Sequence, residues 1–142
     1  LWGVSNFDAD DMRELWALPR GEHCAANQIY YSASERGIEF DLLPALRERG
    51  VPAMAYCPID QGALARDATF AQVGARHGVS AAQAALAWVL GQPGVIAIPK
   101  AVRAAHLREN LAAAALKLTA DDLVQIDRAF APPARKRRLA MS

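Results

Sequence analysis

Four polar residues near the end of the chain have the types and spacing to bind a nucleotide: Lys100, His106, Glu109 and Asn110. Lys100 directly follows the apolar run 95–98 and a proline, and good helix formers begin at Arg103. A lysine between a strand and a helix N-terminus can hold an anion, because the ammonium and the free amides of the first helical turn face it together. The other three residues, spaced three and four positions apart, share one helix face. The segment therefore suggests a phosphate near Lys100 and a base along that face.

The same residues also have a purely structural interpretation. A single lysine after a strand is usually a solvated charge, and a Glu–Asn pair on a helix usually lies on the surface. On this segment alone, both interpretations stay open.

Four strands, each followed by helical sequence, are expected to position these residues. The predicted strands are 1–4, 24–29, 51–55 and 95–98, of which the first and last are expected to be buried. The first predicted helix begins after Asp8. Five more helices are predicted at 38–49, 67–77, 80–90, 103–116 and 119–130. Asp8, Ser80 and Thr119 each have Asp or Gln three positions later, the pattern of a helix cap. Pro44 either kinks the helix 38–49 or marks its true first turn.

Several apolar residues are expected to pack in the interior. For the helix 38–49 these are Phe40, Leu42, Leu43 and Leu46. The three tryptophans Trp2, Trp16 and Trp88 are likewise expected in the core or in packing positions.

The alternation of strand and helix is typical of a parallel α/β fold with right-handed crossovers. The sequence contains no Gly-x-Gly-x-x-Gly, so the Rossmann fingerprint is absent. Polar or aromatic residues end every predicted strand: Ser5-Asn6, Asn27-Gln28, Tyr56-Cys57 and Lys100. In a (β/α)8 barrel the active site lies at this face, with a phosphate site after the last two strands. Because a whole barrel needs roughly 250 residues, the pattern predicts the C-terminal half of a (β/α)8 TIM barrel, with four βα units, a C-terminal helix and a tail.

Composition narrows the class of protein further. The chain has 142 residues and a net charge of +1, which favours neither nucleic acid nor a membrane surface as a partner. Cys24 and Cys57 have no metal-like spacing and suit a reducing compartment. No signal peptide is visible, and the apolar region 79–98 is interrupted by polar residues, Gly and Pro. We therefore expect a soluble, cytoplasmic protein.

With these strand ends identified, the chain resembles an aldo-keto reductase. The motifs that carry the resemblance, in order, are Gly3-Val-Ser-Asn-Phe7, Asn27-Gln28-Ile29, Ala55-Tyr-Cys-Pro-Ile59, Ile98-Pro-Lys100 and His106-Leu-Arg-Glu-Asn110. They cover nearly all of the chain and are highly specific together, although each alone is weak. The segment 34–44 is similar to the bacterial branch that includes methylglyoxal and general aldehyde reductases.

The resemblance implies an NADPH site without a Rossmann domain. Ser5, Asn6 and Gln28 match the positions that hydrogen-bond the nicotinamide carboxamide, which offers both an acceptor and a donor. Tyr56 matches the aromatic residue that stacks on the nicotinamide ring. The remaining matches concern the other parts of NADPH. Cys57, Pro58 and Ile59 match the loop beside the pyrophosphate. Lys100, Ala101 and His106 match positions at the adenosine 2′-phosphate, and Glu109 and Asn110 match the pair at the adenine.

Three departures from the family pattern affect the phosphate end. Ala101 replaces the usual serine and removes a hydroxyl donor, and Cys57 replaces a common serine. His106 replaces the usual arginine, which loses a bidentate and permanently charged contact. Arg103 lies close enough in sequence to compensate. NADPH is the expected cofactor and NADH the weaker alternative.

The family's catalytic Asp, Tyr, Lys and His come from the other half of the barrel. Tyr30, Tyr31 and Tyr56 are not substitutes, since none has a paired lysine and Tyr56 is expected to lie against the cofactor. We therefore assign no catalytic residue and no metal ligand within this chain.

Two functional classes follow. In the first, residues 1–142 are one partial domain with a C-terminal tail at 131–142, and they supply most of the cofactor site of an enzyme that reduces small aldehydes or ketones. In the second, the chain is a non-catalytic half-barrel that binds nucleotide weakly or only self-associates. Its partner would be the missing N-terminal half-barrel or a second copy paired through open sheet edges. The basic run 135–138 is expected to be a solvated tail.

Overall fold

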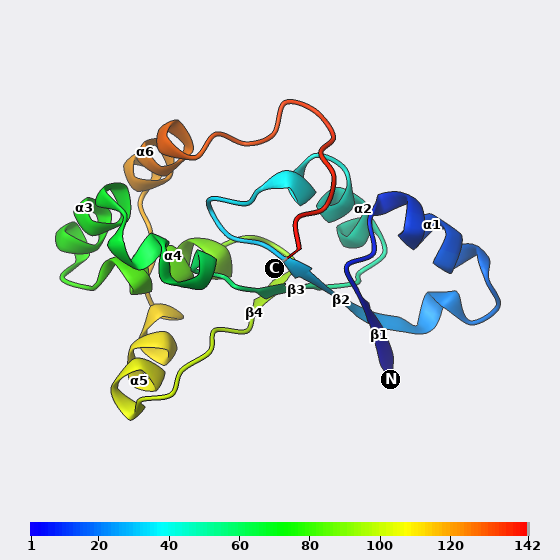
Figure 1. The fold of residues 1–142 in the computed structure, drawn as a ribbon, viewed down its shortest axis with the longest axis horizontal. Helices are drawn as coiled ribbons and strands as arrows, with labels where there is room; N and C mark the ends of the chain where they lie inside the picture. Colours follow the sequence, from blue (N-terminus) through cyan, green and yellow to red (C-terminus); the bar gives the residue numbers. More distant parts are fainter. Residues whose placement is uncertain (142) are drawn as a thin grey trace.

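The computed structural model describes residues 1–141 and contains one sheet of four parallel strands (Figure 1). In their order across the sheet the strands are β1 (Trp2–Ser5), β2 (Cys24–Tyr30), β3 (Ala53–Tyr56) and β4 (Val95–Ala97). Each strand pairs with its neighbour along the chain, and all pairs are parallel. The predicted parallel α/β fold is confirmed, and the strand order is that of consecutive strands in a (β/α)8 barrel.

The register of the sheet brings the strand ends to one edge. Gln28 pairs with Ser5 on one side and with Met54 on the other, and Met54 in turn pairs with Ile96. Since the strands are parallel, the segments that leave their carboxyl ends lie side by side. The predicted site residues of β1, β2, β3 and β4 therefore share this edge.

Within residues 1–141, six α-helices follow the strands. They are α1 (Ala9–Ala17), α2 (Leu42–Glu48), α3 (Ala68–His77), α4 (Ala81–Leu90), α5 (Ala104–Ala113) and α6 (Ala120–Ala129). Short 3₁₀ turns cover Gly21–His23, Gly37–Glu39, Asp60–Gly62 and Leu64–Arg66. None of the helices between residues 1 and 141 has the length and apolar character needed to cross a bilayer.

The helix starts follow local side-chain chemistry. Asp8, Ser80 and Thr119 each accept a hydrogen bond from the backbone three positions ahead, and the residue there bonds back to the cap backbone. These three predicted helix starts are confirmed, and each of them is a capping box. Asp67 caps α3 in a similar way, by accepting from the Phe70 amide.

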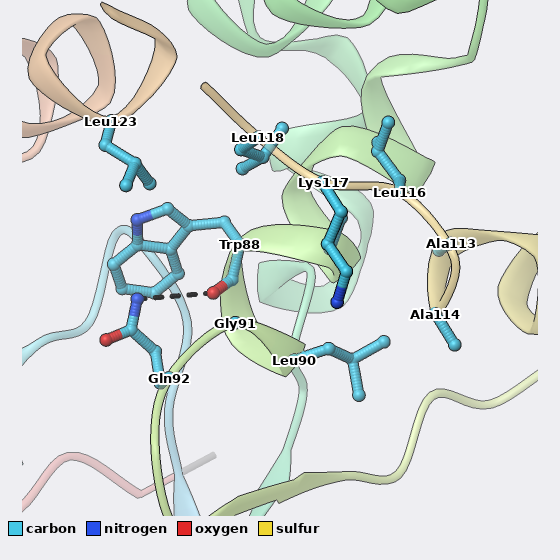
Figure 2. A pocket seen from close by; sticks show the side chains of 11 residues that line it. Trp88, Leu90, Gly91, Gln92, Ala113, Ala114, Leu116, Lys117, Leu118 and Leu123 are labelled. Carbon is cyan, nitrogen blue, oxygen red and sulfur yellow. Dashed lines mark hydrogen bonds between the residues drawn. The ribbon is translucent and has the colours of Figure 1, made fainter. Parts of the chain in front are cut away.

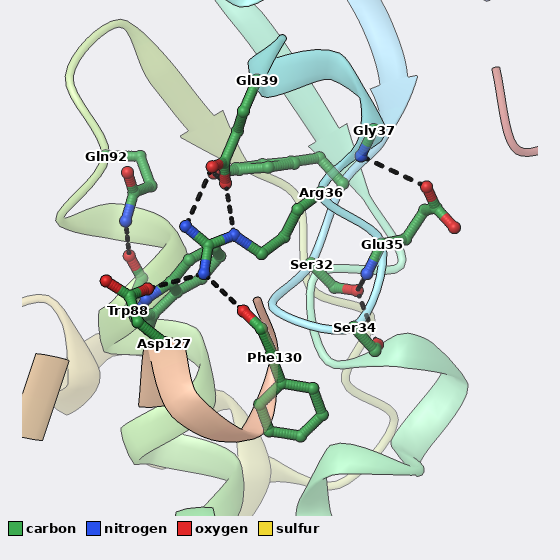
Figure 3. Close-up of polar contacts among 11 residues, drawn as sticks. Ser32, Ser34, Glu35, Arg36, Gly37, Glu39, Trp88, Gln92, Asp127 and Phe130 are labelled. Carbon is green, nitrogen blue, oxygen red and sulfur yellow. Dashed lines mark hydrogen bonds and ion pairs between the residues drawn. The ribbon is translucent and has the colours of Figure 1, made fainter. Parts of the chain in front are cut away.

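The core lies between the sheet and the helices and is built around Trp88, Tyr31 and Phe70, which are almost fully buried. Arg36 closes one side of this core (Figure 3). Its guanidinium donates two 2.9 Å hydrogen bonds to Glu39 and lies 5.0 Å from the centroid of the Trp88 ring.

The same guanidinium also reaches α6. Its third nitrogen donates at 2.6 Å both to Asp127 and to the carbonyl oxygen of Phe130. One charged group thus joins the β2–α2 segment, α4 and the end of α6.

Two strands that were predicted to be buried are only partly buried, and that prediction was wrong. In β1, Trp2 keeps 41% of its surface, and in β4, Ile96 keeps 46%. Both strands lie at the edges of the sheet, where only one side has a neighbouring strand within the described chain. An apolar run indicates burial on both faces only in a central strand.

The helix predicted at 38–49 is shorter and begins later. A 3₁₀ turn covers Gly37–Glu39, and α2 starts at Leu42, so Pro44 falls in the first helical turn. A proline is tolerated there because its missing N–H would have no intrahelical acceptor. Of the predicted contacts, Leu42, Leu43 and Leu46 are buried, whereas Phe40 precedes the helix and is 48% exposed. The helix predicted at 103–116 is likewise shorter, since α5 ends at Ala113.

The basic run 135–138 is exposed, as predicted, but the C-terminal tail also contacts the rest of the fold. It leaves α6 and crosses back toward the sheet (Figure 1). Lys136 Nζ lies 2.7 Å from Asp10 in α1 and 3.4 Å from Asp41, and Leu139 packs against the core. The predicted tail residue Ser142 lies outside the described residues.

Candidate cofactor site

The ends of β1, β2 and β3 bring the predicted carboxamide-binding residues together. The Asn6 amide donates to the Gln28 carbonyl oxygen at 2.9 Å, and Ser5 Oγ donates to the same oxygen at 3.2 Å. The Tyr56 hydroxyl donates to Asn6 Oδ1 at 3.1 Å. Residues separated by up to 50 positions thus form one connected cluster.

A buried asparagine holds the turn that carries Asn6. Asn6 has a left-handed backbone, with φ of 58°, which asparagine adopts more readily than most residues. Asn27 is fully buried, and its Nδ2 donates to the Phe7 carbonyl oxygen at 2.8 Å. The sequence motif contained Asn27, but its role as a support for this turn was not predicted.

The cluster can meet both halves of a carboxamide. The side-chain oxygen Asn6 Oδ1 accepts from Tyr56, which leaves the side-chain nitrogen Asn6 Nδ2 as a donor. The side-chain nitrogen Gln28 Nε2 lies 3.6 Å from the Met54 sulfur, which leaves the side-chain oxygen Gln28 Oε1 as an acceptor. The donor set therefore fits a planar amide lying beside Tyr56.

A cavity of ≈ 590 Å³ lies next to this cluster, between the β3–α3 segment and the start of α5. It is lined by Cys57, Pro58, Ile59, Gln61, Ile98, Pro99, Lys100, Val102, Arg103 and His106. Six of the predicted site residues are among them. Tyr56 of the cluster directly precedes Cys57 of the cavity lining, so the two features meet at the end of β3.

The far end of the cavity is positively charged. Lys100 is exposed, and Arg103 is the N-cap residue of α5, so the first-turn amides border the same space. Arg103 Nη2 lies 2.5 Å from His106 Nε2. A lysine, an arginine and a helix N-terminus around one cavity provide the chemistry that binds a phosphate.

The other predicted residues lie around this end. Ala101 follows Lys100 in the segment before α5, and Glu109 and Asn110 lie one turn beyond His106 on the exposed side of α5. The Glu109 carbonyl oxygen accepts from Gln83 Nε2 at 3.3 Å, which joins α5 to α4. The predicted helix face shared by His106, Glu109 and Asn110 is present.

A second aromatic residue, which the sequence did not single out, supports Tyr56. The rings of Tyr30 and Tyr56 are stacked, with centroids 5.5 Å apart and an angle of 19° between their planes. The Tyr30 hydroxyl donates to Asp60, and burial together with this carboxylate raises the pKa of Tyr30. The sequence signal for this ring contact was the presence of a tyrosine at the end of each of two neighbouring predicted strands.

A separate cavity of ≈ 380 Å³ lies among the helices, between α4 and the segment that joins α5 to α6 (Figure 2). Trp88, Leu123 and Lys117 line it, and the Trp88 carbonyl oxygen accepts from Gln92 Nε2 at 3.2 Å. The predicted cofactor residues line the other cavity instead. No cluster of three or more His, Cys, Asp or Glu side chains suited to a metal ion occurs in residues 1–141.

Comparisons with known proteins agree with this geometry. Methylglyoxal reductase YeaE of Escherichia coli K12 is 43% identical over 145 residues, which cover 99% of this chain and 51% of YeaE. Glyoxal reductase of Bacillus subtilis is 31% identical over 126 residues, covering 88% and 44% of the two chains. The chain therefore spans about half the length of the curated relatives it matches.

Solved structures show the same relationship. An aldo-keto reductase from Klebsiella pneumoniae, crystallised in complex with NADPH, superposes with a TM-score of 0.96 and is 44% identical. The superposition covers 99% of this chain and 51% of that one. The sequence profile of the Aldo/keto reductase family matches residues 1–131. This chain therefore belongs to the aldo/keto reductase family.

Proposed function

We propose that this chain supplies the NADPH-binding half of an aldo/keto reductase that reduces small aldehydes or ketones to alcohols. One observation carries the proposal: at the end of β3, a cluster suited to a carboxamide lies next to a cavity suited to phosphates, with Tyr56 in the cluster and Cys57 in the cavity lining. The NADPH complex of the Klebsiella relative supports it. When bound, NADPH supplies the hydride that reduces the carbonyl carbon.

At the nicotinamide end, Asn6 donates to the carboxamide oxygen and Gln28 accepts from its nitrogen, with Ser5 beside them. Tyr56 packs against the ring and limits its orientation. The loop of Cys57, Pro58 and Ile59 runs along the pyrophosphate.

At the adenosine end, Lys100 and Arg103 hold the 2′-phosphate, with Ala101 and His106 alongside. Arg103 supplies the permanent charge that His106 does not. Glu109 and Asn110 bind the adenine. These two cations favour NADPH over NADH, because NADH lacks the 2′-phosphate.

We assign the chemistry of proton donation to residues outside this chain. Residues 1–142 then form one partial domain, with 131–142 as its tail, and a half-barrel that precedes them in the family's order completes the site. We place the protein in the cytoplasm, since a chain with only the two cysteines Cys24 and Cys57 suits a reducing compartment. The alternative is a half-barrel without catalytic activity that pairs with a second copy through the edges of β1 and β4.

A titration of the 142-residue chain with NADPH, followed by tryptophan fluorescence, tests the proposal. We expect micromolar binding that Lys100→Met weakens about tenfold, since a charge-assisted contact is lost. Lys117→Met is the matched control, because Lys117 lines the other cavity. A folded chain that does not bind NADPH would contradict the proposal.

Two further measurements separate the alternatives. Carbonyl reduction by the pure chain would show that the chain contains its own catalytic groups. That result would contradict our assignment of proton donation to residues outside it. Size-exclusion chromatography at rising concentration distinguishes a monomer from the self-associated half-barrel.

A further inference from the structure

Tyr30 covers one face of the Tyr56 ring. The two residues are register partners at the ends of β2 and β3, and their rings stack at 5.5 Å. A planar ring has two faces available for stacking. With Tyr30 on one of them, a planar ligand can stack on Tyr56 only from the other.

The Tyr30 ring is itself held at its far end. Its hydroxyl donates to Asp60 Oδ1, while Ser34 Oγ donates to Asp60 Oδ2 at 2.9 Å. Ser34 Oγ lies 3.0 Å from Ser32 Oγ, and Ser32 is fully buried. The chain of contacts therefore runs from the half-buried ring pair into the protein interior.

Asp60 also belongs to the loop that lines the cavity. Its amide donates to the Cys57 carbonyl oxygen at 2.8 Å, which closes a tight turn directly after Tyr56. Cys57, Asp60 and Gln61 all have φ near +50°, a conformation that residues other than glycine adopt rarely. Such a turn keeps its shape only when its surroundings hold it, and the contacts of the Asp60 carboxylate do so.

We infer that Tyr30 is a positioning residue for the cofactor, which supports Tyr56 from behind and, through Asp60, ties the nicotinamide-stacking ring to the pyrophosphate loop. The inference rests on the proposed function. Tyr30 touches no reacting atom in this arrangement. It fixes the tilt of Tyr56 before the cofactor arrives, so less freedom is lost on binding.

The test compares two ligands on the 142-residue chain. NADPH needs both ends of the site, whereas 2′,5′-ADP contains only the adenosine end. We expect Tyr30→Leu to weaken NADPH binding about two- to tenfold, the range for loss of an aromatic pair, and to leave 2′,5′-ADP binding unchanged. Tyr30→Phe keeps the ring and loses only the Asp60 bond, so its affinity for NADPH should lie between those of the wild type and Tyr30→Leu.

The outcomes separate this inference from the proposed function. Unchanged affinity for 2′,5′-ADP shows that the Tyr30→Leu chain is folded. Equal weakening of both ligands, or no weakening of either, overturns the role of Tyr30 while the proposed function stands. A wild-type chain that is folded but binds neither ligand refutes the proposed function and this inference with it.

Discussion

One guanidinium nitrogen of Arg103 lies 2.5 Å from His106 Nε2, across the first turn of α5. A guanidinium only donates hydrogen bonds, so His106 Nε2 is the acceptor. The contact holds the arginine against the cavity that Lys100 also lines. In the proposed site, the role of His106 is therefore to orient the neighbouring charge of Arg103.

Arg103→Met should therefore weaken NADPH binding about tenfold and leave NADH binding nearly unchanged. The methionine keeps much of the side-chain volume and loses the charge-assisted contact to the 2′-phosphate. Isothermal titration with the two cofactors measures the ratio. Arg108→Met, on the same helix but outside the cavity lining, is the matched control. Equal losses for NADPH and NADH would argue against a 2′-phosphate contact.

Ala101→Ser is expected to have the opposite effect on cofactor binding and to strengthen the binding of NADPH. A hydroxyl beside Lys100 adds one donor to the phosphate end, which should tighten NADPH binding about two- to tenfold, in line with a net gain of about 0.5–1.5 kcal/mol per hydrogen bond. Ala112→Ser, at the far end of α5, adds a hydroxyl away from the cavity and should change nothing. Competition between NADPH and NADH measures both variants, and a gain of the same size for NADH would contradict the assignment.

The acid stability of the chain should depend on Asp122, a buried carboxylate between α3 and α6. Its side chain is 1% exposed and accepts from Arg76 Nη2 at 2.6 Å, from His77 Nε2 at 2.7 Å and from Thr119 Oγ1 at 2.8 Å. Burial alone would raise the pKa of Asp122, but the bonds from His77, Thr119 and Arg76 outweigh it and lower the pKa below the usual range.

A carboxyl whose pKa is lowered in the folded state stabilises that state above its ordinary pKa, near pH 4, and the stabilisation is lost as pH falls below that value. We expect Asp122→Asn to lower the free energy of unfolding by about 3 kcal/mol at pH 7 and to flatten its decline in acid. Urea unfolding between pH 3 and 7, with the exposed Asp121→Asn as control, measures this. Parallel pH profiles for wild type and Asp122→Asn would exclude the carboxylate as the cause.

Arg36→Met should destabilise the fold by about 3 kcal/mol. The Arg36 side chain is 10% exposed and pairs with Glu39, which also accepts a hydrogen bond from the Tyr31 hydroxyl. Removal of the guanidinium leaves the Glu39 carboxylate without its main counter-ion. Thermal unfolding monitored by the near-ultraviolet signal of Trp88 reports the loss. Arg128→Met, on the exposed side of α6, should stay close to wild type. If both variants unfold alike, the contacts in Figure 3 do not carry this stability.

Much of the fold and site could be predicted from the sequence because the relevant signals are local. The caps at Ser80 and Thr119 depend on residues three positions apart, and both formed as expected. The strand-end motifs likewise placed Asn6, Gln28 and Tyr56 in one cluster.

What the sequence did not reveal depends on neighbours that are distant along the chain. The exposure of Ile96 follows from the position of β4 at the sheet edge, which no apolar pattern encodes. Tyr30 and Asp60 are 30 positions apart, and their contact depends on a turn with three left-handed residues. The return of Lys136 to Asp10 spans 126 positions.

The identical order of the strands in the chain and in the sheet has a consequence for synthesis. Each new strand needs only the strand made just before it as a template, so the sheet can extend one unit at a time as the chain leaves the ribosome. The contact between Lys136 and Asp10 cannot form until residue 136 has emerged, long after the four strands. It is therefore the last of these contacts to close, and it joins the tail to α1.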